Sequence, residues 1–124
     1  MIFVFGGAYQ GMREYARDAL GAKDFSELTS DARDIDFSRG AVCGLEQFVL
    51  GCVQRGESAI DYLEAHRDAW KGCILIGMDF SCGLVPMDAQ ERLWREENGR
   101  LNNYIASHAE RVMRLFCGLP QQIK

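Results

Sequence analysis

The sequence predicts an α/β domain built around a mostly parallel sheet. Two short runs, residues 2–5 and 72–77, are apolar throughout or bounded by glycines, which is typical of strands buried on both faces. Between and after them, apolar residues recur with the spacing of amphipathic helices. Strands that alternate with helices favour a three-layer arrangement around a parallel sheet. A length of 124 residues fits a single domain over residues 1–124.

The first strand, residues 2–5, is expected to end at Gly6 and Gly7. A helix then begins near Met12, because apolar side chains recur there at intervals of three and four residues. Gly21 is a natural end for this helix. The start of the chain therefore predicts a strand, a glycine turn and a helix in direct succession.

The next segment, residues 22–40, is the least regular part of the sequence. It is polar and acidic, and at most short strands fit it, over 25–28 or 33–37. A second helix is expected over 41–55, where apolar residues line one face before Gly56. That face would pack on the sheet.

Ser58 can cap a third helix, which extends to Trp70 and leads into the second buried strand, residues 72–77. In a parallel sheet, ligands bind at the carboxyl ends of the strands. Two glycine-bearing loops, 6–11 and 77–83, leave strands at that edge. We therefore expect both loops to face one crevice.

A long helix is expected from Asp88 to about residue 111, because Asp88 and Glu91 resemble a capping box. Gly99 inside it costs about 1 kcal/mol relative to alanine, so we expect close packing there. Residues 112–118 are expected to form the last strand. The apolar face of the helix carries Trp94, Leu101, Ile105, His108 and Val112.

Composition excludes several classes of function. The net charge is −4, which argues against a nucleic-acid or anionic-membrane partner. No apolar run approaches the roughly 18 residues of a membrane span, and a cytoplasmic location is expected. The five cysteines include no C-x-x-C pair, so neither a disulfide framework nor a zinc site is predicted. We expect reduced thiols and no metal site.

The stretch "GGAYQGMR" has the glycine spacing of a phosphate-binding loop, G-x-x-x-x-G-K-[ST]. The lysine and the hydroxyl of that pattern are replaced by Met12 and Arg13. Backbone N–H groups and the helix dipole can still bind an anion there. The alternative is a purely structural turn. The candidate nucleotide- or phosphate-binding residues are Gly6, Gly7, Ala8, Tyr9, Gln10, Gly11, Met12 and Arg13.

The C-terminal part, residues 74–124, carries a combination of short motifs. They are Gly83, Val85 and Pro86, then Gly99, Arg100 and Asn102, then Ala109, Glu110 and Val112, and finally Gly118, Leu119, Pro120 and Lys124. Together they resemble the end of the adenosylcobinamide kinase / adenosylcobinamide-phosphate guanylyltransferase family, which assembles the nucleotide loop of cobalamin. The resemblance implies a P-loop NTPase-like (RecA-like) topology of reduced size, a corrinoid ligand and a homo-oligomer. Any bound nucleotide would be ATP or GTP with magnesium.

The chain also departs from the family pattern. The family's Asn-Glu-Val-Gly segment resembles residues 78–81 here, so Asp79 stands for the glutamate. Asp79 is thus the candidate catalytic residue, and the alternative role is a helix cap or turn former. The family's Walker B-like aspartate has no counterpart in residues 41–44, and residues 21–40 lack its guanylyl-accepting histidine. His66 and His108 are expected to pack on helices.

Three hypotheses follow. The first is a catalytically impaired relative that binds a nucleotide or a partner in corrinoid metabolism. The second is an active kinase or nucleotidyltransferase, with Arg13 or Arg17 on phosphate and Asp79 on magnesium or the acceptor hydroxyl. The third is a protein-interaction scaffold that binds no small ligand.

Overall fold

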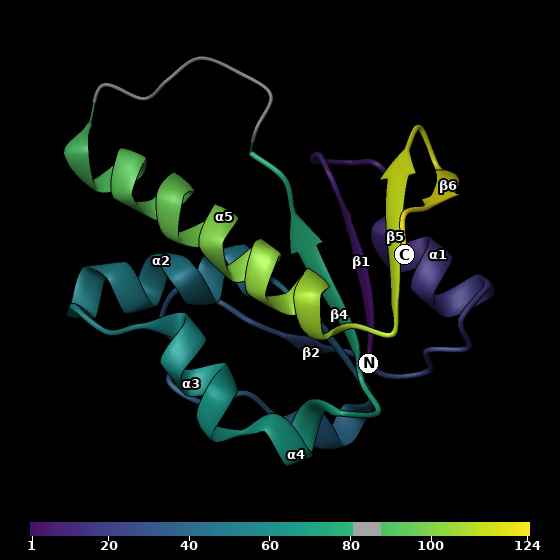
Figure 1. Cartoon of the computed structure of the whole chain (residues 1–124), viewed down its shortest axis with the longest axis horizontal. Coiled ribbons are helices and arrows are strands. Elements are labelled where there is room, and N and C mark those ends of the chain that lie inside the picture. The colour runs from purple at the N-terminus through teal and green to yellow at the C-terminus, as the bar shows by residue number, and fades with distance from the viewer. Residues whose placement is uncertain (81–87) are drawn as a thin grey trace.

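The structure, a computed structural model, describes residues 1–80 and 88–124. Its six-stranded sheet has the order β2-β3-β4-β1-β5-β6 (Figure 1). The strands from β1 to β5 run parallel, and β6 pairs antiparallel with β5. The bounds are β1 (Ile2–Gly6), β2 (Ser26–Glu27), β3 (Ala41–Cys43), β4 (Ile74–Met78), β5 (Arg111–Phe116) and β6 (Leu119–Gln122).

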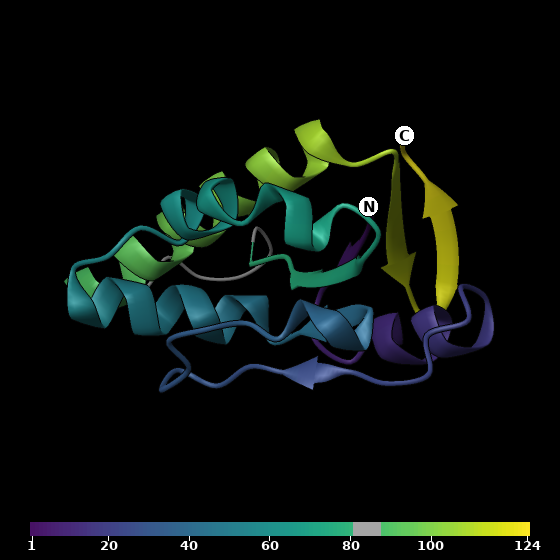
Figure 2. The same cartoon turned by 90° about the horizontal axis from the view of Figure 1, so that it is seen from below.

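Helices cover both faces of the sheet, which confirms the predicted α/β class and is consistent with a reduced P-loop NTPase-like fold. One apolar cluster packs α1 against one face of the sheet. A larger cluster packs α2, α3, α4 and α5 against the other face. Figures 1 and 2 show α1 apart from the group formed by α2, α3 and α5. The helices are α1 (Met12–Asp18), η1 (Phe37–Arg39, a 3-10 turn), α2 (Leu45–Arg55), α3 (Ala59–Ala65), α4 (Arg67–Trp70) and α5 (Ala89–His108).

The predicted helix over 41–55 was wrong at its start, where residues 41–43 form β3. Ala41 and Val42 are buried and pair with Ile74 and Leu75 of β4. Gly44, at φ 81°, then separates strand from helix. A Cβ atom on Gly44 would lie 2.5 Å from the carbonyl oxygen of Leu28, so this turn requires glycine.

Three further predictions need correction. Residues 33–37 form no strand, whereas the alternative over 25–28 contains β2. The third helix breaks at His66 into α3 and α4. Gly99 has no close packing partner in the described part of the chain, where a Cβ atom on it would meet nothing within 4 Å. By contrast, Ser58 and Asp88 cap α3 and α5 as predicted, accepting hydrogen bonds at 3.2 and 2.7 Å.

The β5–β6 hairpin was not predicted as a hairpin. Its turn places Cys117 at φ 52° and Gly118 at φ 75°, the pair of positive angles that a tight hairpin turn favours.

Beyond β6, the ammonium group of Lys124 donates to the carbonyl oxygens of Ala106 and Ser107, at 3.1 and 3.2 Å. Lys124 therefore stabilises the C-terminal end of α5, where orphan carbonyls and the helix dipole favour a cation.

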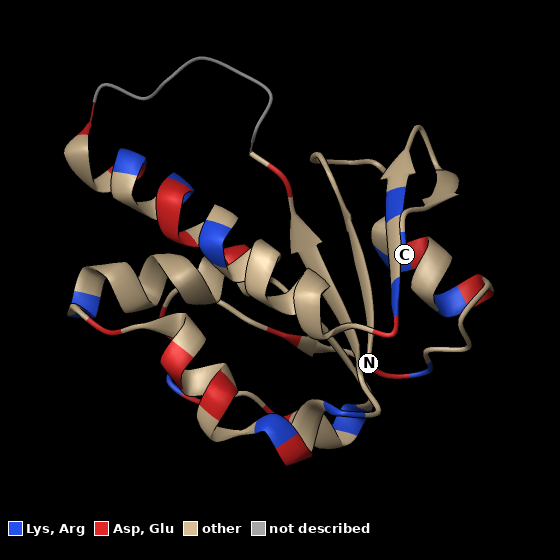
Figure 3. Ribbon diagram, in the orientation of Figure 1, with Lys and Arg blue, Asp and Glu red and all other residues tan. Residues whose placement is uncertain are grey.

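Charged side chains of both signs interleave along α5 (Figure 3). Arg100 pairs with Glu97 at 2.8 Å, one turn away on the same helix. No helix in the described part of the chain is long and apolar enough to cross a membrane.

Tyr104 links α5 to α3, and this link predicts a loss of stability at high pH. Its hydroxyl donates to the Glu64 carboxylate, and burial together with that bond raises the pKa of Tyr104 from 10.0 to about 12. The contribution of this hydroxyl to the free energy of unfolding is complete below about pH 10. It is lost between about pH 10 and 12, because Tyr104 releases its proton at a lower pH in the unfolded chain than in the folded protein. We expect the free energy of unfolding to fall more steeply in this window for the parent than for Tyr104→Phe. Equal slopes in urea-unfolding experiments would contradict the prediction.

Candidate functional site

The two loops predicted to share a crevice leave adjacent strands. β1 lies between β4 and β5, with Gly6 opposite Met78 and Leu115. The N–H group of Asp79 donates to the carbonyl oxygen of Gly6 at 2.8 Å. The glycine loop and Asp79 are therefore neighbours at the carboxyl edge of the sheet. Residues 81–87, which include Gly83, Val85 and Pro86 of the family pattern, lie outside the described residues.

The glycine loop is fastened to the β5–β6 turn. The carbonyl oxygen of Gln10 accepts from the Gly118 N–H group at 3.0 Å, and its side-chain oxygen accepts from the Cys117 N–H group. A Cβ atom on Gly6 would lie 2.6 Å from the carbonyl oxygen of Leu115. The first glycine is thus required by the fold itself, whatever the loop binds.

The backbone N–H groups of the glycine loop have no hydrogen-bond partner among the described residues. Within the described part of the chain, no backbone N–H group of residues 7–14 donates a hydrogen bond. Tyr9, at φ 61°, is fully exposed, and Gly11, at φ 87°, precedes the first residue of α1. Unpaired N–H groups of this kind favour an anion. Ala8 and Gly7 complete the predicted loop.

The two residues that replace the loop lysine and hydroxyl are engaged elsewhere. The Arg13 guanidinium pairs with Glu27 and lies 4.8 Å from the centroid of the Phe25 ring. The hydrogen bond to Glu27 raises the pKa of Arg13 further. Met12 packs into the apolar cluster under α1. The charge of Arg13 is therefore directed along the α1 face, toward β2.

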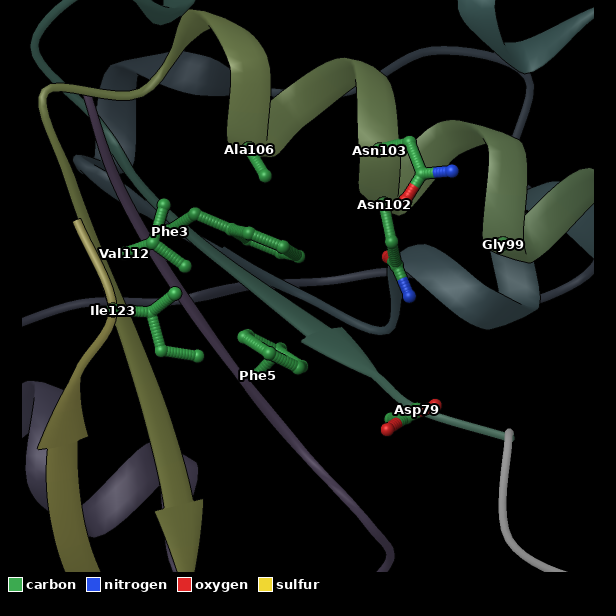
Figure 4. Close-up of a pocket in the computed structure, with 9 residues that line it drawn as sticks. All are labelled: Phe3, Phe5, Asp79, Gly99, Asn102, Asn103, Ala106, Val112 and Ile123. Carbon is green, nitrogen blue, oxygen red and sulfur yellow. The ribbon is translucent and has the colours of Figure 1, made fainter.

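Two adjoining cavities of about 380 and 300 Å³ lie on the opposite face, beside α5. Asp79, Gly99 and Asn102 line both, and we call the combined hollow the α5 cleft. Figure 4 shows its apolar wall on β1, β5 and the chain after β6, facing the polar side chains of α5. The wall is formed by Phe3, Phe5, Val112 and Ile123, and Ala106 lines the cavity from α5. A volume of this size suits a small organic ligand.

Two asparagines one helical turn apart border the α5 cleft. The side-chain amides of Asn98 and Asn102 both donate to the carbonyl oxygen of Met78, at 2.8 and 3.0 Å. Their oxygens are buried and have no hydrogen-bond partner among the described residues. Asn98 is only 1% exposed. Each unpaired buried acceptor costs about 1–3 kcal/mol, so a fold that retains two of them beside a cleft calls for an explanation.

Burial changes the pKa values of two other ionisable groups at this edge of the sheet. Burial raises the pKa of Glu46 at the start of α2 and that of the Cys43 thiol at the end of β3. A raised pKa keeps the Cys43 thiol protonated and unreactive near neutral pH. The Trp94 indole donates to the carbonyl oxygen of Glu46 at 2.7 Å.

The histidines lie away from the cleft. The ring of His66 stacks on Tyr62 at 4.1 Å, and that of His108 lies 4.3 Å from Tyr104. Each ring places its Nδ1 atom against a carbonyl oxygen of the preceding turn. Neither lines the α5 cleft. No group of three or more potential metal-binding side chains occurs among residues 1–80 and 88–124.

The sequence identified Asp79 and the glycine loop but missed the rest of the cleft. Asn102 was noted only as part of the family pattern, and Asn98 was not noted. A signal was present, because Trp94, Leu101 and Ile105 define a stripe whose intermediate position is Asn98. A polar residue inside an apolar stripe is buried, and a buried polar group needs a partner.

Comparison with models of known protein families gives a match to this chain. A family model described as cobinamide kinase / cobinamide phosphate guanyltransferase matches residues 48–123. The matched segment includes Asp79 and all of α5, but not the glycine loop at residues 6–11. A search of curated proteins finds no match.

Proposed function

The chain belongs to the cobinamide kinase / cobinamide phosphate guanyltransferase family, and on that premise we propose that it is a catalytically impaired member. It binds a ligand of corrinoid metabolism, a nucleotide or a corrinoid, without transferring a phosphoryl or guanylyl group. The family relationship supports the link to cobalamin biosynthesis. The state of the glycine loop supports the loss of catalysis.

The position of Arg13 is the observation that carries this proposal. In phosphoryl transfer, the loop lysine neutralises the β- and γ-phosphates and the adjacent hydroxyl holds magnesium. Met12 supplies neither a charge nor a hydrogen-bond donor. Arg13 cannot ligate magnesium, and its charge is neutralised by Glu27 beside the Phe25 ring. Arg17, the other cation considered from the sequence, pairs with Asp18 at 3.1 Å.

Among the described residues, no histidine lines the cleft at this edge of the sheet, where guanylyl transfer would need one. A histidine intermediate needs an imidazole within reach of the nucleotide. His66 and His108 instead pack against tyrosines beyond the cleft, on the side of α3 and α4. What remains at the carboxyl edge is binding capacity: loop N–H groups that have no partner among the described residues, and a cleft lined by Asp79. Assembly into a homo-oligomer stays a prediction.

Titration calorimetry tests the proposal with ATP and GTP, each with magnesium, in the presence and absence of adenosylcobinamide. We expect nucleotide dissociation constants no tighter than about 0.1 mM, since the loop offers hydrogen bonds but no cation. We also expect binding of adenosylcobinamide, and no phosphorylated corrinoid after prolonged incubation. Steady formation of adenosylcobinamide phosphate would contradict impairment and favour the active kinase. Absence of heat with every ligand would favour the protein-interaction scaffold.

A further inference from the structure

The β5–β6 hairpin has one face that no described helix covers. Side chains alternate across a strand, so every second residue of β5 from Val112 onward points to the face of the sheet that carries the larger apolar cluster. The residues that lie opposite these on β6, and just after it, share that face. We call this surface the hairpin face, and its residues are Val112, Arg114 and Phe116 on β5, with Ile123, Gln121 and Leu119 across from them.

Most of the hairpin face is apolar and exposed. Phe116, Leu119 and Ile123 are 65%, 70% and 55% exposed. On the reverse side of β5, Met113 and Leu115 are buried in the cluster under α1. Figure 1 shows none of the described helices in front of β5 and β6. A monomer rarely leaves a contiguous apolar surface of this kind in water, so we expect another surface to cover it.

The hairpin face is self-complementary. Along the strands it has an apolar cross-strand pair at the turn, a polar pair in the middle and an apolar pair beside the α5 cleft. A twofold axis that runs parallel to the strands, between two copies, places β5 of each copy over β6 of the other. Phe116 then faces Leu119 of the second copy, and the apolar pair beside the cleft meets its counterpart in the same way. The two sheets would pack about 10 Å apart.

The polar pair favours a second copy over an unrelated apolar surface. Arg114 is exposed, and its guanidinium has no carboxylate partner among residues 1–80 and 88–124. A guanidinium only donates hydrogen bonds, whereas the side chain of Gln121 carries an amide oxygen that accepts them. The twofold arrangement places Arg114 of each copy opposite Gln121 of the other, and it offsets the two Arg114 side chains by one strand. An apolar partner would instead bury Arg114 without an acceptor, which is costly.

We propose that two copies of this chain associate through the hairpin face, with the twofold axis parallel to β5 and β6. The inference goes beyond the proposed function and does not depend on any ligand. Because Val112 and Ile123 also line the α5 cleft, the second copy borders that cleft in the dimer. A standard interface buries about 800 Å² per partner, and six side chains on two short strands supply only part of that area. We therefore expect a dissociation constant of roughly 1–100 µM.

Sedimentation velocity of the parent protein measures this association. Over a concentration range of about 1 to 300 µM, we expect a monomer at the low end and a dimer at the high end. A monomer throughout would overturn the inference. A trimer or an open-ended assembly would overturn it as well, because a twofold face closes after two copies.

Phe116→Ser and Leu119→Ser test whether the hairpin face is the interface. Each removes an apolar side chain that is exposed in the monomer, so the fold does not depend on it. We expect the dissociation constant of the dimer to rise at least about tenfold in either variant. Leu93→Ser is the matched control, since Leu93 is 44% exposed on α5 and lies outside the hairpin face. It should associate as the parent does, and unchanged association in both hairpin variants would contradict the proposal.

Cross-linking through Cys117 tests the direction of the axis. Cys117 is exposed at the hairpin turn, and an axis parallel to the strands places both turns at the same end of the dimer. A bismaleimide that spans the roughly 10 Å between packed sheets should therefore link two copies, and Cys117→Ser should abolish this link. An axis across the strands would place the turns at opposite ends. A dimer that is not linked through Cys117 would thus overturn the proposed arrangement.

Discussion

Replacement of Gly51 by alanine is expected to lower the free energy of unfolding by about 3 kcal/mol, as for other overpacked sites. Gly51 is buried inside α2, and a Cβ atom there would lie 2.1 Å from the carbonyl oxygen of Ser30. The obstructing atom belongs to backbone, which Arg55 also fixes through a hydrogen bond to the same oxygen at 3.4 Å. Helix propensity alone would favour alanine by about 1 kcal/mol, so the clash reverses the sign.

Gly99→Ala is the matched control for this prediction. Gly99 is also inside a helix, but a Cβ atom there would meet no atom of residues 1–80 and 88–124 within 4 Å. We expect alanine to stabilise the protein by about 0.5–1 kcal/mol through helix propensity. Urea unfolding followed by the fluorescence of Trp70 and Trp94 measures both variants. Stabilisation by both would show that α2 does not rest on the backbone of Ser30.

The two glycines explain where sequence reasoning succeeded and where it failed for the fold. Each glycine interrupts a helical pattern. The sequence does not show whether another segment of the chain packs closely against Gly51 or against Gly99. Gly99 was expected to pack closely and Gly51 was not considered, yet the structure shows the reverse. The strands over 2–5 and 72–77 were predictable because short apolar runs next to glycines are typical of buried strands. β3, with only Ala41, Val42 and Cys43, is too short to show a period.

The site was predictable only in part, for a similar reason. A glycine loop and a carboxylate after a strand are local signals, and both were found at the expected edge of the sheet. The direction of Arg13 was not predictable, because its partners Phe25 and Glu27 belong to a segment with a two-residue strand. The α5 cleft depends on how a helix crosses the ends of strands, which is a tertiary property. Asn98 could have been noticed, since it interrupts an apolar stripe.

Restoring the phosphate-loop pattern with Met12→Lys and Arg13→Ser is expected to tighten ATP binding by about 10- to 100-fold. A charge-assisted hydrogen bond contributes about 1.5–3 kcal/mol, and each 1.4 kcal/mol is about tenfold in affinity. The N–H groups of residues 7–14 have no acceptor among the described residues, so the lysine would add the missing cation and the serine a magnesium ligand. Titration calorimetry with ATP and magnesium measures the change.

Arg13→Ser alone is the control for the double variant. It separates the effect of the new lysine from the effect of losing the Arg13–Glu27 ion pair. Arg13 and Glu27 are both well exposed, with side chains 48% and 60% accessible, so breaking their pair should cost no more than about 1 kcal/mol. Because this variant adds the magnesium ligand but not the cation, its ATP affinity should stay closer to that of the parent than to that of the double variant. If the double variant binds ATP no more tightly than Arg13→Ser, the loop does not cradle phosphates. Its glycines would then serve only the turn that Leu115 and Gly118 enclose.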